Sequence, residues 1–213
     1  METNNYGSQF LRGAALIAGL AAVLGNAVAG GVESAAQPFA QTQFRGHPIT
    51  LYTAGPTVVA NAATMDAFAA VVAPTLREFS ATTDFEACAS ICRAIDDPTA
   101  WAVTPITIQS HISCPAMDSC PEGYEPTGFD IHSHPQLSRY KPNATDRLFL
   151  KNNRSQIAMN PHPDQFSEAD YASPGYMVSK TKLRFQHGSY LSVRDVAESA
   201  DAGDDLVANN ISP

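Results

Sequence analysis

The residues of this chain best suited to chemistry lie in one short stretch, Gly128 to Pro135, with the sequence Gly-Phe-Asp-Ile-His-Ser-His-Pro. Apolar and polar residues alternate along it, which predicts a half-buried β-strand. Asp130, His132 and His134 then share one face. The two imidazoles stand roughly 7 Å apart at the backbone, close enough to bind one metal ion. Because Pro135 ends strand pairing, the histidines should lie at an accessible end of a sheet.

The other groups that metal chemistry would need occur before and after this stretch. Glu86 lies near the start of an apolar strand predicted over Phe85–Ile95, and on its own it is interpreted as an exposed edge residue. Ser167 and Asp170 form a Ser-x-x-Asp sequence, which is typical of a helix N-cap. Both side chains would lie at the start of a helix, so a capping role and a role in a site are compatible.

Length and composition favour a single folded domain. The chain has 213 residues, 44% of them hydrophobic, which is enough for one sizeable core. It carries 21 Asp and Glu residues against 13 Lys and Arg residues, and this acidic balance argues against nucleic-acid binding, which requires a basic face. Residues 195–213 are acidic and contain no base, so they are predicted to form a flexible, solvated tail.

Residues 1–29 are typical of an export signal. An apolar run extends from Ala14 to Leu24, and Ala27-Val28-Ala29 matches the small-x-small pattern of a cleavage site. The run is too short to span a bilayer comfortably. We therefore expect an exported protein, periplasmic or secreted. The alternative is a membrane anchor formed by residues 13–31, whose glycines would suit close packing in a membrane.

Cysteine usage also favours an oxidising compartment. The chain has an even number of cysteines, compatible with two disulfides: Cys88, Cys92, Cys114 and Cys120. Cys114 and Cys120 are interpreted as a loop closed on itself, whereas Cys88 and Cys92 would stand about 13 Å apart on an extended strand, too far to pair. Cross-pairing therefore stays open. A four-cysteine zinc site is the weaker alternative, because the spacing lacks the tight knuckles of such sites.

Residues 30–59 are rich in Gly, Pro, Thr and Gln and are predicted to be a linker or an irregular first strand. The domain proper is expected over residues 60–194. Apolar residues recur at helical spacing over 65–79, which predicts an amphipathic helix that Pro74 should kink or divide.

The strands expected after this helix favour a mixed α/β fold. The segments Phe85–Ile95 and Trp101–Ile108 predict an antiparallel hairpin beside the histidine strand, and residues 176–185 predict a closing hairpin. The expected fold is a mixed, mainly antiparallel sheet flanked by helices.

The order of the motifs resembles that of the JAB/MPN (JAMM-type) metalloprotease superfamily: a glutamate on a strand, then His-x-His, then Ser-x-x-Asp. The sequence Asp-Phe-Glu-Ala-Cys around Glu86 resembles the glutamate strand of bacterial and phage-tail members. The stretch Phe166 to Asp170, followed by Gly-Tyr-Met, resembles an uncharacterised branch found in bacterial secreted and toxin-like proteins. The resemblance covers residues 60 to 190 and implies a cytidine-deaminase-like fold.

Carried onto this sequence, the resemblance implies a Zn²⁺ ion with water in its fourth position, as hydrolytic zinc requires. The implied ligands are His132, His134 and Asp170. Glu86 would move the proton of the attacking water as general base. Ser167 would donate a hydrogen bond to the oxyanion.

One departure from the family pattern is the long connection between the second histidine and the serine, residues 136–165, where the family has a short one. It makes His162 and Asp164 rival third ligands, although a surface position suits His162 better. Asp130 is either an acceptor for an imidazole N–H or an exposed acid. The insertion holds five bases and two acids, and we interpret it as a substrate-recognition flap, with an uninvolved solvated loop as the alternative.

These observations predict an exported zinc-dependent peptidase or isopeptidase that acts on a peptide or protein. The alternative of another class is a catalytically silent JAB/MPN-like binding or assembly module of a secretion or toxin system. A non-peptidase amidohydrolase barrel is disfavoured, because the chain is short and lacks repeated strand–helix units.

Overall fold

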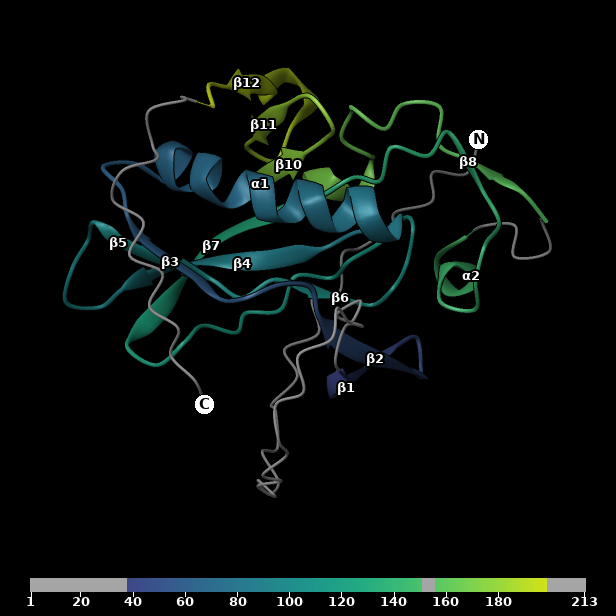
Figure 1. The fold of residues 1–213 in the computed structure, drawn as a ribbon, viewed down its shortest axis with the longest axis horizontal. Coiled ribbons are helices and arrows are strands. Elements are labelled where there is room, and N and C mark those ends of the chain that lie inside the picture. Colours follow the sequence, from purple (N-terminus) through teal and green to yellow (C-terminus); the bar gives the residue numbers. More distant parts are fainter. Residues whose placement is uncertain (1–37, 151–155, 199–213) are drawn as a thin grey trace, which may run out of the picture. The chain divides into compact units, whose positions relative to one another are not determined.

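The computed structural model describes residues 38–150 and 156–198 (Figure 1). The expected export signal and most of the expected acidic tail lie outside the described residues. Within the described part, no helix has the length and hydrophobicity needed to cross a membrane.

The elements in chain order are β1 Pro38–Phe44, β2 His47–Thr53, β3 Val58–Asn61, α1 Met65–Thr83, β4 Cys88–Ala94, β5 Ala100–Val103, β6 Ile106–Thr107, β7 Tyr124–Ser133, β8 Arg139–Tyr140, α2 Asp146–Phe149, β9 Ala158–Met159, η1 Ala169–Ala172, β10 Gly175–Val178, β11 Leu183–Gln186, η2 Tyr190–Ser192 and β12 Arg194–Val196.

Ten of the strands form one sheet in the order β1-β2-β6-β4-β7-β10-β11-β12, which β3 joins through β5 and β4. Its ladders are antiparallel except for the pair β7 and β10. Strands β8 and β9 form a separate two-stranded sheet. The expected mixed, mainly antiparallel sheet is therefore confirmed, as are the hairpin beside the histidine strand and the closing hairpin of β10 and β11.

Helix α1 crosses one face of this sheet (Figure 1). Thr64 caps its start by accepting a hydrogen bond from the amide of Ala67, and Asp84 ends it in the left-handed conformation with φ 62°. Its apolar side packs on Ile91, Ile131 and other strand residues in the main core. Pro74 is exposed inside the helix and does not divide it. In the described part α1 is the one long helix, so the sheet is not flanked by helices on both faces.

The opposite face of the sheet is covered by a loop that two disulfides tie to β4. Cys88 pairs with Cys114 and Cys92 pairs with Cys120. The interpretation of residues 114 to 120 as a self-closed loop is therefore wrong, because both of these cysteines reach across to the strand. Ser90 lies between the two bridges and donates a hydrogen bond to the carbonyl of Met117 at 2.7 Å. Disulfides and a hydrogen bond therefore fix the loop that covers this face of the sheet, whereas helix α1 covers the other face.

Of the two expectations for residues 30–59, a linker or an irregular first strand, the linker is wrong for the described part, where the chain forms strands. Residues 38–53 form the hairpin of β1 and β2 at one end of the sheet, and β3 follows directly. The turn consists of Arg45 and Gly46, with φ 49° and 79°, the two left-handed residues that a tight hairpin of this kind requires. Arg-Gly is a weak turn signal beside Asn-Gly, so the pattern gave little indication of a hairpin.

The start of the expected flexible tail also belongs to the sheet. β12 includes Asp195, which forms ion pairs with Lys182 at 3.0 Å and Arg184 at 2.9 Å. Glu198 pairs with Arg77 of α1 at 2.8 Å. The boundary at residue 195 was therefore wrong, because these acids have basic partners that are distant in sequence.

Candidate metal centre

The two histidines lie where β7 ends, on the sheet face opposite α1. His132 is paired with Cys88 of β4 and with Met177 of β10, while Ile131 points into the main core. The strand direction continues past the last ladder pair, because the amide of His134 donates to the carbonyl of Val178 at 2.9 Å. Both imidazoles therefore project from the same side, with ring centroids 5.1 Å apart. The alternation predicted from the sequence is confirmed.

Asp170 reaches the same place from the short helix η1. Its carboxylate accepts a hydrogen bond from the amide of Ser167 at 2.6 Å, which is the return bond of a capping box. The buried amide of Gln186 donates to the carbonyls of Asp170 and Ser173 at 2.7 and 2.5 Å. The turn that carries the carboxylate is therefore held at both ends.

Three side chains converge at this point. The carboxylate oxygens of Asp170 lie 3.7 Å from Nε2 of His132 and 3.6 Å from Nε2 of His134, and all candidate ligand atoms lie within 4.8 Å of one another. These distances are too long for hydrogen bonds. They are close to the separation of about 3.3 Å between two ligands of one tetrahedral zinc ion, which follows from zinc–ligand bonds of about 2.0 Å.

The buried Nε2 atom of His132 tests whether a metal fits here, because it has no hydrogen-bond partner. A buried polar atom without a partner is rare and unfavourable. A neutral imidazole nitrogen with a free lone pair facing a second imidazole and a carboxylate is a suitable donor set for zinc. The residues therefore fit the ion that the motif implied.

The other nitrogen of each ring faces an oxygen acceptor. Nδ1 of His132 lies 3.4 Å from Asp130, and Nδ1 of His134 lies 3.2 Å from the carbonyl of Pro163. An acceptor at Nδ1 places the proton there and leaves Nε2 free to bind a metal. Asp130 is itself oriented by the Ser173 hydroxyl at 2.9 Å. Of the two roles expected for Asp130, acceptor for an imidazole N–H is the one the contacts support.

The opposite charges of the imidazoles and the carboxylates in this cluster shift one another's pKa values toward the charged forms. Burial lowers the pKa of His132, but the carboxylates of Asp170 and Asp130 outweigh burial and raise this pKa well above 6.5. Burial raises the pKa of Asp170, but His132 and His134 outweigh it and hold this pKa far below the ordinary range. The carboxylate is thus ionised at any ordinary pH, and a proton on the imidazole competes with a metal ion for the same place.

Glu86 lies in the short segment between α1 and β4 and is only 7% exposed. The interpretation of Glu86 as an exposed strand residue is wrong, because β4 begins two residues later and the side chain lines the same cavity as His134, Ser167 and Asp170. Burial raises the pKa of Glu86 to about 7, although the two neighbouring histidines oppose the shift. A carboxyl with a pKa near neutrality can both accept and return a proton.

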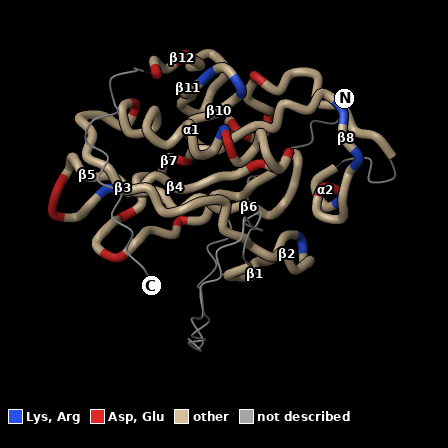
Figure 2. Tube along the Cα trace, in the orientation of Figure 1, with Lys and Arg blue, Asp and Glu red and all other residues tan. Residues whose placement is uncertain are grey.

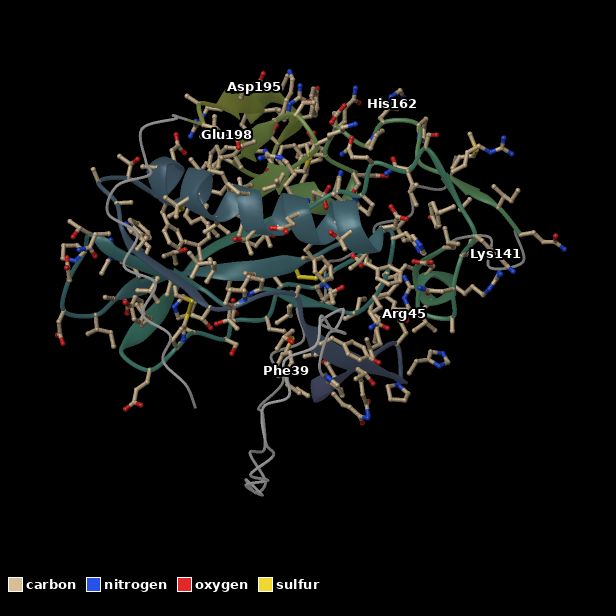
Figure 3. The ribbon with its side chains drawn as sticks, in the orientation of Figure 1. Phe39, Arg45, Lys141, His162, Asp195 and Glu198 are labelled. Atoms are coloured by element: carbon tan, nitrogen blue, oxygen red, sulfur yellow. A yellow bond between two sulfur atoms is a disulfide. The ribbon has the colours of Figure 1, made fainter. Side chains whose placement is uncertain are left out.

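The Ser-x-x-Asp motif is only partly a helix cap. Ser167 is exposed on the cavity wall, and the residue at the cap position of η1 is Glu168, which makes no side-chain capping bond. The rival ligand His162 lies on the loop between β9 and η1 (Figure 3). It is one of the residues that line the cavity. Neither His162 nor Asp164 belongs to the group of potential ligands found among the described residues.

A second histidine–aspartate cluster, not predicted from the sequence, lies beside the Glu86 segment. Asp146, at the start of α2, is fully buried and accepts hydrogen bonds from four donors, at distances of 2.7 to 2.8 Å: Ser110 Oγ, the His111 amide, His111 Nδ1 and the Asn143 amide. The His111 ring stacks on Tyr140 and meets Phe85 edge to face. In the sequence Asp146 is one of two acids in an insertion with five bases, and no motif spacing marks it.

This cluster holds the Glu86 backbone. The amide of Glu86 donates a hydrogen bond to the carbonyl of Ser110 at 2.8 Å. The carbonyl of Glu86 accepts a hydrogen bond from the hydroxyl of Thr107 at 2.6 Å. Asp146 in turn binds Ser110. The first half of the insertion is therefore fixed against the site, and its described basic residues lie at β8 and in α2: Arg139, Lys141 and Arg147 (Figure 2).

Comparison of the chain with protein-family models, with curated proteins and with solved structures found no match.

Proposed function

We propose that this protein is a zinc-dependent peptidase or isopeptidase of the JAB/MPN type. One observation carries the proposal: a buried Nε2 atom of His132 has no hydrogen-bond partner and faces His134 and Asp170 in the cavity wall that also contains Glu86. Ordinary packing does not account for that arrangement, because Nε2 of His132, with or without a proton, stays 3.7 Å from the Asp170 carboxylate, too far for a hydrogen bond.

In this proposal His132, His134 and Asp170 hold zinc, which supplies a Lewis acid and lowers the pKa of water to about 7. Glu86 accepts the proton of the attacking water as its oxygen bonds to the amide carbon. It then gives a proton to the leaving nitrogen as the carbon–nitrogen bond breaks. Ser167, on the cavity wall, donates a hydrogen bond to the carbonyl oxygen as negative charge develops there.

The two disulfides indicate that the domain folds in an oxidising environment. We propose export to the periplasm or the exterior, with residues 1–29 as the signal. The substrate would then be a peptide or protein met outside the cytoplasm.

The test is the metal content of the full chain, purified without chelator or affinity metal. We expect about one zinc per chain, in keeping with a three-ligand site. The double variant His132→Ala, His134→Ala should lose it. His162→Ala is the matched control, because it removes an imidazole from the same cavity but outside the ligand group, and it should keep the zinc.

Glu86→Gln separates binding from catalysis. It should retain zinc and cleave no peptide, since the amide cannot accept the proton. A wild-type chain that neither contains zinc nor takes it up would contradict the metalloprotease. Zinc binding without cleavage of any peptide would instead favour a binding module.

A further inference from the structure

The cavity at the metal centre has walls of two chemical kinds. Part of the lining is the ligands and the polar residues already described. The rest consists mainly of apolar side chains from three separate segments: Ile112, Met159, Pro161 and Phe166. Such a mixture of apolar walls with a few convergent polar groups is typical of a substrate site.

Most of the residues that form the apolar wall are fixed by their surroundings. Phe166 is 8% exposed and its ring meets the ligand His132 edge to face at 6.1 Å. The amide of Ile112 donates to the Ser110 hydroxyl, and the chain is bridged two residues later through Cys114 to Cys88. The wall exists before a ligand arrives, so little conformational entropy is lost when one binds.

Met159 is the adaptable part of this wall. It lies in β9, is 62% exposed and still lines the cavity. Its backbone is fixed because its ladder partner is Arg139 and the next amide, of Asn160, donates to Ser138 at 2.9 Å. An unbranched thioether on a fixed strand can adjust to apolar groups of different shape.

The charges of the cavity exclude one kind of substrate group. The described residues that line it include the carboxylates Glu86 and Asp170 but neither Lys nor Arg. The reacting amide would occupy the open position of the proposed zinc ion, so a carboxylate on a flanking residue would lose its hydration beside the apolar wall without gaining a cation, which is unfavourable. An Asp or Glu side chain, or a free C-terminus, is therefore poorly suited to this cavity.

The size of the cavity limits what enters it. Its volume is about 290 Å³, at the lower end of the roughly 300–1,000 Å³ typical of small-molecule sites. The cavity is also partly open to solvent, so it accommodates one large residue beside the reacting amide while the rest of a peptide extends outside it.

We propose that Ile112, Met159 and Phe166 form a subsite for a bulky apolar side chain next to the scissile amide. The protein is then an endopeptidase that cleaves beside residues such as Leu, Phe or Met and needs no terminal carboxylate. This inference rests on the proposed peptidase function and names its substrate class.

The experiment uses the zinc-loaded full chain and a mixture of peptides with acetylated N-termini and amidated C-termini, with products identified by mass spectrometry. Cleaved bonds should carry a bulky apolar residue at one fixed flanking position. Synthetic peptides based on one cleaved sequence, with Leu, Ala or Asp at that position, then give kcat/KM. We expect the Leu peptide to exceed the Asp peptide by at least about 10-fold, the lower range of discrimination by an apolar pocket.

Variants at Met159 test the wall directly, and its exposure makes them compatible with folding. Met159→Ala should lower kcat/KM for the Leu peptide about 3- to 10-fold and leave the Ala peptide unchanged. Met159→Lys should raise the rate for the Asp peptide relative to Leu, because it adds a cation. Ile95→Ala is the matched control, since Ile95 is 65% exposed and lies outside the cavity.

Cleavage with no preference between Leu and Asp, or cleavage that requires a free C-terminus, would overturn the subsite and leave the peptidase intact. A zinc-loaded chain that cleaves no peptide of the mixture would overturn the peptidase itself, and the subsite with it.

Discussion

Two histidine–aspartate clusters flank Glu86, and they differ in how completely their polar atoms are satisfied. In one, Asp146 contacts His111 at 2.7 Å and accepts three further hydrogen bonds. In the other, Asp170 stays 3.6 and 3.7 Å from two imidazoles, one of which has a buried nitrogen without a partner. The same residue types serve as an internal brace in the first case and as a candidate ligand set in the second. The two clusters contain the same residue types. They differ in the distances between carboxylate and imidazole and in whether every buried polar atom has a hydrogen-bond partner.

The largest expected effect separates the two aspartates by stability. Asp146→Ala removes a fully buried carboxylate and leaves its four donors without this acceptor, so it should lower the free energy of unfolding by about 3–5 kcal/mol. Asp170→Ala removes one capping bond, to the amide of Ser167, and the longer contacts of 3.6 and 3.7 Å to the two imidazoles, so it should cost less than Asp146→Ala in zinc-free protein. Urea unfolding with and without zinc measures both. Zinc at a thousand times its Kd should add about 4 kcal/mol to the Asp146 variant and nothing to the Asp170 variant, and the reverse pattern would remove the distinction.

Glu86 lies between the clusters, and its charge should make zinc-free stability depend on pH. Its pKa is about 7 in the folded protein against 4.5 as the ordinary value. Between these values the folded state keeps a proton that the unfolded state has lost, so stability falls as pH rises, by about 3 kcal/mol in all. Glu86→Gln lacks this titration. It should match the wild type near pH 4 and exceed it by about 3 kcal/mol at pH 8, with chelator present throughout. Equal pH profiles would show that Glu86 is not desolvated.

The acceptor behind His132 should affect zinc affinity and not folding. Asp130→Ala should weaken zinc binding by about 10- to 100-fold, the usual effect of removing a group that orients a ligand. Gly175→Ala should act in the same direction, because its Cβ would come within 2.5 Å of the Asp130 carboxylate. Competition with a chelating dye measures the affinity. Glu168→Ala, at an exposed acid near Asp170, serves as the control and should change nothing.

The smallest effect is expected at His111. His111→Phe keeps the ring between Phe85 and Tyr140 and leaves Asp146 with three of its donors. It should cost about 1 kcal/mol, the net value of one hydrogen bond, and leave zinc affinity as it is. A loss of zinc in this variant would mean that His111 belongs to the metal centre.

The sequence was informative where residues act through local periodicity. The alternation around His132 and His134 predicted a shared face, and that face is what the strand presents. The resemblance placed Glu86, Ser167 and Asp170 at the site, and the structure brings them to one cavity. The local sequence around Glu86 gave no sign that its side chain is buried. The elements that cover it, α1 and the loop of Ser110, are brought there by tertiary packing.

Other features have no local signal at all. Asp146 and His111 are 35 residues apart, and nothing in the spacing marks a basic insertion as the holder of a buried carboxylate. The hairpin of β1 and β2 likewise depends on pairing with β6, which lies about fifty residues further along the chain. Contacts between residues so far apart in the sequence are decided by tertiary packing, which local patterns of residues do not reveal.

The crossed disulfides affect how the protein matures. Each native bridge joins one cysteine of the first pair to one of the second, over 26 and 28 residues, so no native bridge links cysteines that are neighbours in the chain. When a chain enters an oxidising compartment from its N-terminus, Cys88 meets Cys92 before either partner arrives. Bridges made in order of appearance are then non-native and must be exchanged, a process that takes seconds to hours depending on the isomerase present. If bridges form in that order, correct assembly of the segment next to Glu86 requires disulfide isomerisation as well as oxidation.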